Sequence, residues 1–337
     1  MEGMRESLES LSVFVALDSL YTKSERSPLA RSKPASEKYR ELARCLEDVL
    51  KNKLHIESAA KTRDLPFSTI FSLAEMVIYS SATVDEICVH VMNPVYAGDF
   101  LTQHSLNVAF LSSRLGAALH LSYEQLTQLC VSALLHDIGM TKIDPDSYLQ
   151  EGAITQSDRQ AIQEHPNLGK RFFERIGVEF PWLVRVIREE HRREHGQGYP
   201  KGNTGELHIY SKIVGVCDFF EALTHQRPNR PAYHPADVMK KIIDTKDRLF
   251  TKDILRAMIE ALALYPVGSL VQLNNNMMAQ VVEAVQGSPL RPVVRPLEEE
   301  TNALSERLID LSTDNNVYIT GLVYADPYQV PEDLRIT

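Results

Sequence analysis

Cysteine is scarce in this chain, and its placement excludes a cysteine-based site. The 337 residues include four cysteines, Cys45, Cys88, Cys130 and Cys217, each more than 40 residues from the next. Zinc sites built on thiolates and dithiol redox centres require closely spaced pairs such as Cys-x-x-Cys. We therefore interpret the cysteines as small core residues, and any metal site must be built from histidine and carboxylate.

Long apolar runs and an excess of positive charge are lacking as well. No stretch approaches the roughly 18 uncharged apolar residues that cross a bilayer, and the first ten residues, MEGMRESLES, lack the apolar core of a secretion signal. We therefore expect no membrane span and a cytoplasmic location. The formal net charge of −9 disfavours bulk nucleic acid as a partner, because binding to phosphates requires clustered lysine and arginine.

The distribution of helix formers and turn residues predicts a mainly α protein in three parts. Residues 1–93 are rich in helix formers and predict a mostly helical region, for which a regulatory role is one interpretation. Residues 94–263 contain successive amphipathic patterns and predict an all-helical domain. Residues 264–337 contain short β-branched runs separated by Asn, Gly and Pro, which predict a small β-rich module. Inside this module, we expect the acidic segment PLEEETNALSERLIDL to be a helix or a solvated loop.

Polar residues interrupt the apolar patterns of the middle part. They are His104, His136, Asp137, His165, His191 and Asp218. Taken singly, each has a plain explanation as a helix cap, a surface residue or a buried hydrogen-bond acceptor. Taken together, they offer a histidine or carboxylate from each of five helices, which is how helical bundles build metal sites.

This donor set favours a particular chemistry. Imidazole and carboxylate suit iron, manganese, zinc or nickel, and a carboxylate such as Asp137 can bridge two ions. Two ions about 3.5 to 4 Å apart generate a bridging hydroxide near neutral pH and also bind a phosphoryl oxygen. The residues thus favour hydrolysis of a phosphodiester.

The motifs resemble the HD-GYP domain family over roughly residues 94–262. Five of them follow the family's order: His104, His-Asp at 136 and 137, HPNLG from 165, GYP at 198 to 200 and DFFEALT from 218. The resemblance implies a helical HD-type bundle and two or three metal ions, often iron or manganese. It also implies hydrolysis of cyclic di-GMP to pGpG or GMP, with Asp137 and His136 as the catalytic residues.

Each matching residue acquires an expected role from the family. One metal ion would be held by His104, His136, Asp137 and Asp218, and the second by His165 and His191 with Asp137 shared. The expected contacts to substrate are Gly198, Tyr199, Pro200, Arg227 and Arg230. The two arginines belong to QRPNR, which resembles the family's RPYR segment, and guanidinium groups suit phosphate oxygens.

The first departure from the family lies just before GYP. Where the family has His-His-Glu, this chain has Glu190, His191 and Arg192. Glutamate binds hard cations, so Glu190 would keep the second site and shift it towards manganese or magnesium. The alternative is that Glu190 turns outward and the second site is weakened or lost, and the sequence leaves both open.

Two further departures concern the phosphate and a third metal. Met140 stands where the family has a lysine, and Lys142, which we keep as a candidate substrate contact, does not share a helix face with position 140. Loss of the lysine predicts slow turnover. Phe100 stands where some members have a glutamate that holds a third ion. We therefore expect two divalent ions, iron or manganese first, with zinc, nickel or magnesium as alternatives.

The leading hypothesis is a metal-dependent phosphodiesterase that hydrolyses cyclic di-GMP, slowly, through a metal-bridging hydroxide. One alternative is an inactive member that serves as a cyclic di-GMP receptor, or as a scaffold that docks diguanylate cyclase-type partners through its GYP surface. Another is a phosphohydrolase acting on other nucleotides. The sequence leaves the oligomeric state open, with a homodimer as one possibility.

Overall fold

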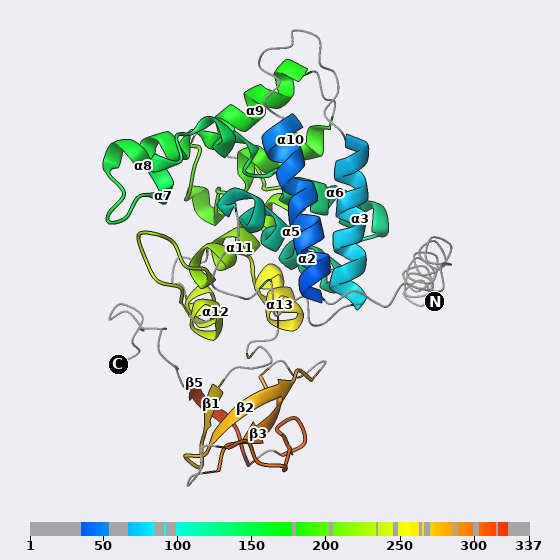
Figure 1. Cartoon of the computed structure of the whole chain (residues 1–337), viewed down its shortest axis with the longest axis vertical. Coiled ribbons are helices and arrows are strands. Elements are labelled where there is room, and N and C mark those ends of the chain that lie inside the picture. The colour runs from blue at the N-terminus through cyan, green and yellow to red at the C-terminus, as the bar shows by residue number, and fades with distance from the viewer. Residues whose placement is uncertain are drawn as a thin grey trace.

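The computed structural model describes residues 35–53, 67–83, 91, 99–176, 180–201, 205–233, 235–244, 249–262, 265, 270–285, 288, 290–298, 303–314 and 316–322. Helices make up the described chain up to Ala261, and strands follow from Leu270 (Figure 1). The prediction of a mainly α fold with a small C-terminal β module is confirmed. The domain bounds given above stay predictions.

The helices lie in the following order. They are α2 (Ala35–Glu47), the π-helix η1 (Asp48–Lys53), α3 (Phe67–Thr83), α5 (Phe100–Ala118), α6 (Tyr123–Leu135), the 3-10 helix η2 (Ile138–Lys142), α7 (Asp146–Leu149), α8 (Gln156–Gln163), α9 (His165–Ile176), α10 (Pro181–Glu189), the 3-10 helix η3 (Glu194–Gly196), α11 (Ile209–Thr224), α12 (Pro235–Asp244) and α13 (Lys252–Ala261). None of the helices among the described residues has the length and apolarity needed to cross a lipid bilayer.

Helix α5 is the central element of the helical part. It begins after Asp99, whose side chain accepts hydrogen bonds from the backbone N and the hydroxyl of Thr102 at 3.0 and 2.7 Å, which is a strong N-cap. Its apolar and small residues are buried against α2, α3, α6, α11 and α13. Polar side chains on this helix, His104 among them, therefore point into the protein interior.

The connection after α6 brings two distant segments together. Helix α6 ends at Leu135, and the chain turns through His136 and Asp137 into η2. A Cβ on Gly139 would overlap the backbone carbonyl of His165. Because glycine has no side chain, η2 lies directly against the start of α9. The His-Asp pair is thereby placed beside His165.

A buried carboxylate joins α10 to α11. Glu189 accepts hydrogen bonds from Nε of Arg185, from the backbone N of His208 and from the hydroxyl of Ser211, each at 3.1 Å. Buried carboxylates require such partners. The network fixes the end of α10, which carries the next residues Glu190 and His191, relative to α11.

The C-terminal module is one antiparallel sheet with the order β4-β3-β2-β1-β5. Its strands are β1 (Leu270–Leu273), β2 (Met278–Glu283), β3 (Val293–Pro296), β4 (Ile309–Asp310) and β5 (Ile319–Leu322). It has a core of its own, formed by Val271, Leu273, Ala279, Val281, Val294, Ile309 and Leu311.

The connections between the strands of this module test one expectation from the sequence. The turn at Asn274–Asn276 joins β1 to β2, with Asn276 in the left-handed region at φ 65°. The acidic segment PLEEETNALSERLIDL was expected to be a helix or a solvated loop. This expectation is wrong for its residues Ile309–Asp310, which form β4. Ile309 pairs with Val294 of β3 and is buried in the sheet core, so tertiary pairing overrides the local polarity of the segment.

Candidate metal centre

The structure brings all seven predicted ligands to one place. They come from α5 (His104), the end of α6 (His136 and Asp137), the start of α9 (His165), the turn after α10 (Glu190 and His191) and the middle of α11 (Asp218). Six of them are buried and His191 is partly exposed. Their roles as ligands stay predictions, but the geometry they require is present.

One candidate metal-binding group consists of His104, His136 and Asp137, whose ligand atoms all lie within 4.8 Å of one another. Nε2 of His104 lies 3.5 Å from Oδ2 of Asp137, and Nε2 of His136 lies 3.7 Å from the same oxygen. Two imidazole nitrogens therefore converge on one carboxylate oxygen.

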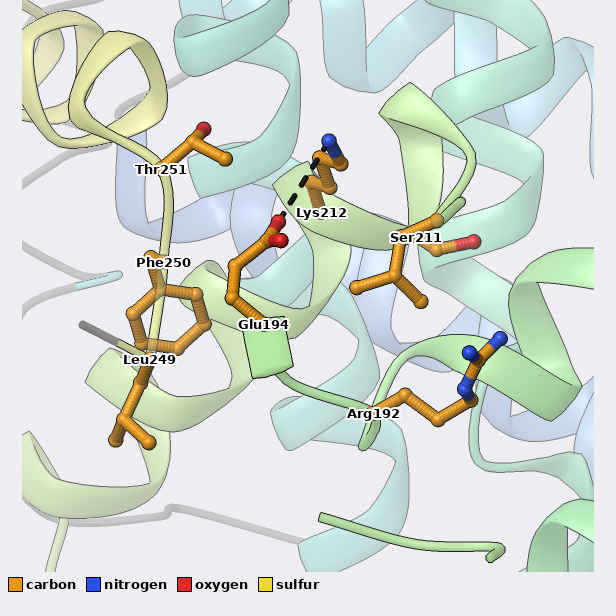
Figure 2. A pocket seen from close by; sticks show the side chains of 8 residues that line it. Arg192, Glu194, Ser211, Lys212, Leu249, Phe250 and Thr251 are labelled. Atoms are coloured by element: carbon orange, nitrogen blue, oxygen red, sulfur yellow. Dashed lines mark ion pairs between the residues drawn. The ribbon is translucent and has the colours of Figure 1, made fainter. Parts of the chain in front are cut away.

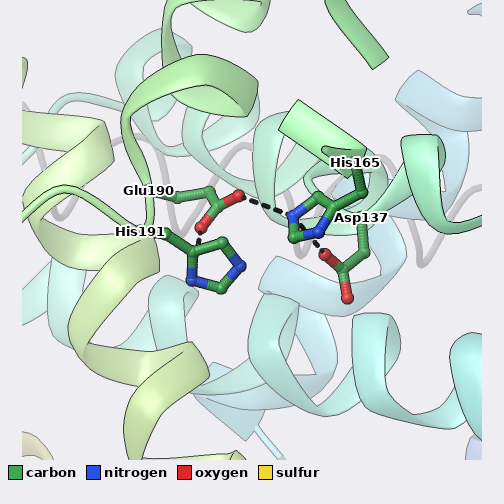
Figure 3. A group of neighbouring side chains, drawn as sticks. All are labelled: Asp137, His165, Glu190 and His191. Carbon is green, nitrogen blue, oxygen red and sulfur yellow. Dashed lines mark hydrogen bonds and ion pairs between the residues drawn. The ribbon is translucent and has the colours of Figure 1, made fainter. Parts of the chain in front are cut away.

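The second group consists of Asp137, His165, Glu190 and His191 (Figure 3), also with ligand atoms within 4.8 Å. Nε2 of His165 lies 3.2 Å from Oδ1 of Asp137 and 3.3 Å from Oε1 of Glu190. Nδ1 of His191 lies 3.1 Å from Oε2 of Glu190. Asp137 thus offers one oxygen to each group.

Asp218 lies between the two groups. Its Oδ1 is 3.3 Å from Nε2 of His104, and its Oδ2 is 3.4 Å from Nδ1 of His191. The family resemblance assigns Asp218 to the first group alone. In this chain its carboxylate is placed to serve both groups, as Asp137 is.

The histidine tautomers are set by partners outside the centre. Nδ1 of His136 and Nδ1 of His165 lie 2.8 Å from the backbone carbonyls of Ala133 and Ile162. A carbonyl oxygen only accepts, so both Nδ1 atoms carry the hydrogen, and Nε2 of each neutral ring bears a lone pair. For His165 that lone pair faces two carboxylate oxygens, which also only accept. Such an arrangement needs a cation or an extra proton between the groups.

Unsatisfied atoms show that divalent ions fit this site. Among the buried side chains of the described residues, Nε2 of His136, Oδ1 of Asp137 and Oε2 of Glu190 have no hydrogen-bond partner. An unpaired buried polar atom costs about 1 to 3 kcal/mol. Cations held by nitrogen and oxygen donors would satisfy all three atoms, and mixed imidazole and carboxylate ligands suit iron, manganese and zinc.

The burial of these groups shifts their protonation when no cation is present. Burial raises the pKa of Glu190 to about 8. Burial lowers the pKa of His104, but the negative charge of Glu221 and the hydrogen bonds to Asp218 and Glu221 together outweigh burial and raise that pKa to about 10. Burial also lowers the pKa of His165, but the charge of Asp137 and the charge and hydrogen bond of Glu190 together outweigh burial and raise that pKa to about 9. Protons held by these groups would be released when metal binds.

Glu190 points into the centre rather than outward. Its side chain is fully buried, and its two oxygens face His165 and His191 respectively. Of the two orientations that the sequence leaves open, the structure has the one in which this glutamate can act as a ligand of the second group.

The GYP segment folds back over His191. Gly198 has φ 77°, and a Cβ there would overlap the backbone carbonyl of His191. The backbone N of Tyr199 donates to that carbonyl at 3.2 Å, and the Tyr199 ring stacks on the His191 ring with centroids 4.5 Å apart. The peptide bond before Pro200 is cis. Gly198 and Tyr199 thus cover one side of the second group.

The two predicted phosphate-binding arginines are placed differently. Arg227 lies over the Phe100 ring at 4.2 Å, with its NH2 atom 3.5 Å from Oε2 of Glu221, and so borders the first group. Arg230 lies over the Tyr233 ring at 5.3 Å and donates to the carbonyl of Pro231 at 3.1 Å. NH1 of Arg230 also donates to the carbonyl of Leu223 at 3.4 Å, so its guanidinium is held by its own loop and by the end of α11.

The positions around the missing lysine form an apolar cluster. Met140 is buried with Leu101 and Ile143, and Phe100 packs against them. Lys142 lies at the last position of η2 and is exposed. Phe100 also stacks on His104, with ring centroids 5.9 Å apart. Met140 and Phe100 thus put apolar side chains where the family has a lysine and, in some members, a glutamate.

Two residues of the centre were missed in the sequence. Glu221 is fully buried, and its Oε2 lies 2.5 Å from Nδ1 of His104, while Asn107 donates to Oε1 of Glu221 at 3.1 Å. Helical spacing carried a signal for both. Asn107 follows His104 by three positions and Glu221 follows Asp218 by three, and such pairs share a helix face.

A separate hollow lies near the start of α11 (Figure 2). Its lining residues are Arg192, Glu194, Leu207, Ser211, Lys212, Leu249, Phe250 and Thr251. Nζ of Lys212 lies 3.6 Å from a carboxylate oxygen of Glu194. The lining includes none of the predicted ligands, so the hollow is distinct from the metal centre.

Comparison with known families identifies the segment that carries this centre. Residues 93–254 match the model of the HD domain family. This segment is an HD domain. Residues 270–329, which contain the sheet, match the KOW domain associated with HD domain. The resemblance found in the sequence is confirmed.

Curated relatives align with more than half of the chain. Cyclic di-GMP phosphodiesterase PA4108 of Pseudomonas aeruginosa is 28% identical over 229 residues, which are 64% of this chain and 55% of the relative. The 3'3'-cGAMP-specific phosphodiesterase 1 of Vibrio cholerae is 29% identical over 189 residues, 55% of this chain and 42% of the relative. The chain thus spans about half the length of these relatives.

A solved structure shares the fold of the HD domain. It is that of Bd1817, an HDG"Y"P protein from Bdellovibrio bacteriovorus, with a TM-score of 0.53 and 14% sequence identity, covering 68% of this chain and 73% of that one. At this identity the match concerns the fold alone.

Proposed function

We propose that the HD domain binds two divalent metal ions and hydrolyses cyclic di-GMP to pGpG or GMP. The observation that carries this proposal is the convergence of imidazole nitrogens on the two oxygens of Asp137, with unsatisfied buried atoms in both groups. When bound, a pair of divalent ions supplies a water of lowered pKa and a Lewis acid for a phosphoryl oxygen. Iron and manganese are the first candidates, with zinc, nickel and magnesium as alternatives.

The charges of the ligand set support an anionic substrate. Asp137, Glu190 and Asp218 are buried carboxylates, and the histidines would bind metal as neutral rings. Two divalent ions bring more positive charge than three carboxylates neutralise. A loaded centre would therefore attract a phosphodiester, and Arg227 at its border adds a guanidinium suited to phosphate oxygens.

The protein's own residues have distinct tasks in this proposal. Asp137 is shared by the two groups and His136 belongs to the first, and in this proposal both act next to the reacting phosphorus. Tyr199 covers His191 and limits access of water to the second group. Gly198 allows the loop to approach the centre closely, and Pro200 completes that loop.

The substrate class is supported by the relatives, whose names specify cyclic di-GMP and 3'3'-cGAMP. The test is incubation of the full chain, purified without chelator and reconstituted anaerobically with Fe(II) or Mn(II), with each of these two cyclic dinucleotides and with simple mononucleotides. Products are followed by chromatography, and metal is quantified per chain. Linear formation of pGpG or GMP that Asp137→Asn abolishes is the expected result. Turnover of mononucleotides alone would contradict the substrate.

A second function is favoured by the apolar cluster at Met140. No basic side chain stands at that position, and Met140 is buried with Leu101 and Ile143. A centre that binds the phosphodiester without stabilising its transition state would act as a cyclic di-GMP receptor. Tight binding with two metals per chain and no product in the same assay would identify this function. Docking of diguanylate cyclase-type partners on the GYP surface, a homodimer and a cytoplasmic location are further predictions from the sequence.

A further inference from the structure

A chain of buried hydrogen bonds connects helix α2 to the metal centre. The hydroxyl of Tyr39 donates to Oδ1 of Asn107 at 2.6 Å, and Nδ2 of Asn107 donates to Oε1 of Glu221 at 3.1 Å. The other oxygen of Glu221 lies 2.5 Å from Nδ1 of His104. All four side chains are buried, and they come from α2, α5 and α11. Tyr39 is therefore three hydrogen bonds away from His104, whose Nε2 faces Asp137 and Asp218.

Tyr39 determines the direction of donation along this series of hydrogen bonds. An amide oxygen only accepts and an amide nitrogen only donates, so the hydroxyl on Oδ1 turns Nδ2 of Asn107 towards Glu221 and towards Nε2 of His225 at 3.2 Å. Nδ1 of His225 donates to the carbonyl of Glu221 at 3.0 Å, which leaves Nε2 of His225 as an acceptor. A flipped amide would place its oxygen against the carboxylate of Glu221.

The hydroxyl of Tyr39 remains a donor under all ordinary conditions. Burial raises its pKa well above the usual value, and the nearby charge of Glu221 raises it further. The Tyr39 ring is stacked on Phe110 of α5, with centroids 6.2 Å apart. The position of this donor is therefore fixed by the packing of α2 on α5.

The last hydrogen bond of this series, between Glu221 and His104, acts on the metal centre. A carboxylate that accepts from a histidine makes its other nitrogen more basic and fixes the ring, and such outer partners control metal affinity. With Asn107 in its observed orientation, Glu221 receives a donor on Oε1 and keeps Oε2 for His104. Without it, Oε1 of Glu221 loses the hydrogen bond from Asn107, and the carboxylate can rotate away from His104.

We propose that Tyr39 is a positioning residue for the metal centre, and that α2 controls metal affinity through Asn107, Glu221 and His104. The inference rests on the metal centre proposed above and is independent of the substrate. Because Tyr39 belongs to the N-terminal part of the chain, a displacement of α2 would break the 2.6 Å bond to Asn107 and weaken metal binding. This gives the N-terminal region a physical route to regulate the HD domain.

The test compares Tyr39→Phe with Tyr210→Phe in the full chain. Tyr210 is a matched control, because it is also buried and its hydroxyl donates one side-chain hydrogen bond, to Gln128 at 3.2 Å. This bond is not part of the series of hydrogen bonds that leads to His104. Free Mn(II) is titrated by electron paramagnetic resonance at a temperature where both variants are folded. We expect the apparent dissociation constant of Mn(II) to rise about 3- to 10-fold in Tyr39→Phe, and to stay within about twofold in Tyr210→Phe.

Glu221→Gln provides the second measurement. This variant removes the carboxylate through which Tyr39 acts, and we expect it to weaken Mn(II) binding by about 10- to 100-fold. Adding Tyr39→Phe to Glu221→Gln should then have little further effect, because residues of one network are not additive. A merely structural role for Tyr39 would instead lower the thermal stability of the metal-free protein and leave Mn(II) affinity unchanged.

Three results would overturn the inference: Mn(II) affinity of Tyr39→Phe equal to the parent, an equal loss in Tyr210→Phe, or additive losses in the double variant. A parent chain that binds no Mn(II) would overturn the metal centre and this inference together. Absence of cyclic di-GMP hydrolysis alongside the expected Mn(II) affinities would overturn the substrate proposal alone and support the role of Tyr39.

Discussion

Oε1 of Glu190 lies 3.3 Å from Nε2 of His165, so two atoms that can each donate an electron pair to a cation face one another. This relationship predicts the effect of Glu190→Gln. Glutamine keeps the size of the side chain but removes its charge, so the second group loses one anionic donor. We expect metal content, measured by mass spectrometry after reconstitution with Mn(II), to fall from about two to about one ion per chain, as expected for a two-metal site.

Two further variants make that result specific. Glu164→Gln is a matched control, because Glu164 is exposed and lies just before His165 without facing the centre. It should leave the metal content unchanged. Glu190→His restores the ligand type of the family and should keep both ions. Two ions per chain in Glu190→Gln would show that Glu190 is not a ligand.

Asp137→Asn should have a larger effect than any other single change. Each oxygen of Asp137 faces a different group, at 3.2 Å from His165 and 3.5 Å from His104. An amide can offer only one oxygen, and its nitrogen would repel a cation. We expect both ions to be lost, measured as metal per chain after gel filtration. Asp144→Asn, at an exposed position, should keep both, and unchanged metal content in Asp137→Asn would refute the shared ligand.

Much of the centre could be predicted from the sequence because its ligands break apolar helix patterns. Asp218 interrupts the apolar run of α11, and His136 and Asp137 follow the apolar end of α6. Such polar residues are costly to bury without a partner, so their positions indicate a site. The helical fold followed from the same periodicity.

Other features depend on contacts between distant segments. The sequence shows Asn107 and Glu221 as polar residues within two helices, but the bonds that join them to Tyr39 and His104 cross three helices. The inward orientation of Glu190 depends on packing of the turn after α10 against α11. Strand β4 forms because Ile309 is buried in the sheet core. Helical spacing places Asn107 and Glu221 on the same helix faces as ligands, but the partners of these contacts lie too far away in the sequence to be predicted.

Gly198→Ala should disturb the second group, whereas Gly196→Ala should not. Both glycines have positive φ, 77° and 75°, so alanine is strained by about 1 to 2 kcal/mol at either position. Only at Gly198 would the added Cβ overlap the carbonyl of His191, since the space at Gly196 is open. We expect Gly198→Ala to lower Mn(II) occupancy of the second group and to cost more unfolding free energy than Gly196→Ala. Equal metal occupancy in the two variants would contradict the close approach.

Met140→Lys should raise turnover and lower stability at the same time. A lysine there would return a cation to the border of the centre, and loss of a single transition-state donor costs about 100-fold or more in kcat. Met140 is buried with Leu101 and Ile143, so the ammonium group displaces apolar packing at a cost of about 1 to 3 kcal/mol. The measurements are kcat for cyclic di-GMP with Mn(II) and urea unfolding, with Met140→Leu as the control of similar volume. A folded Met140→Lys chain with two ions and unchanged kcat would show that this position does not limit the rate.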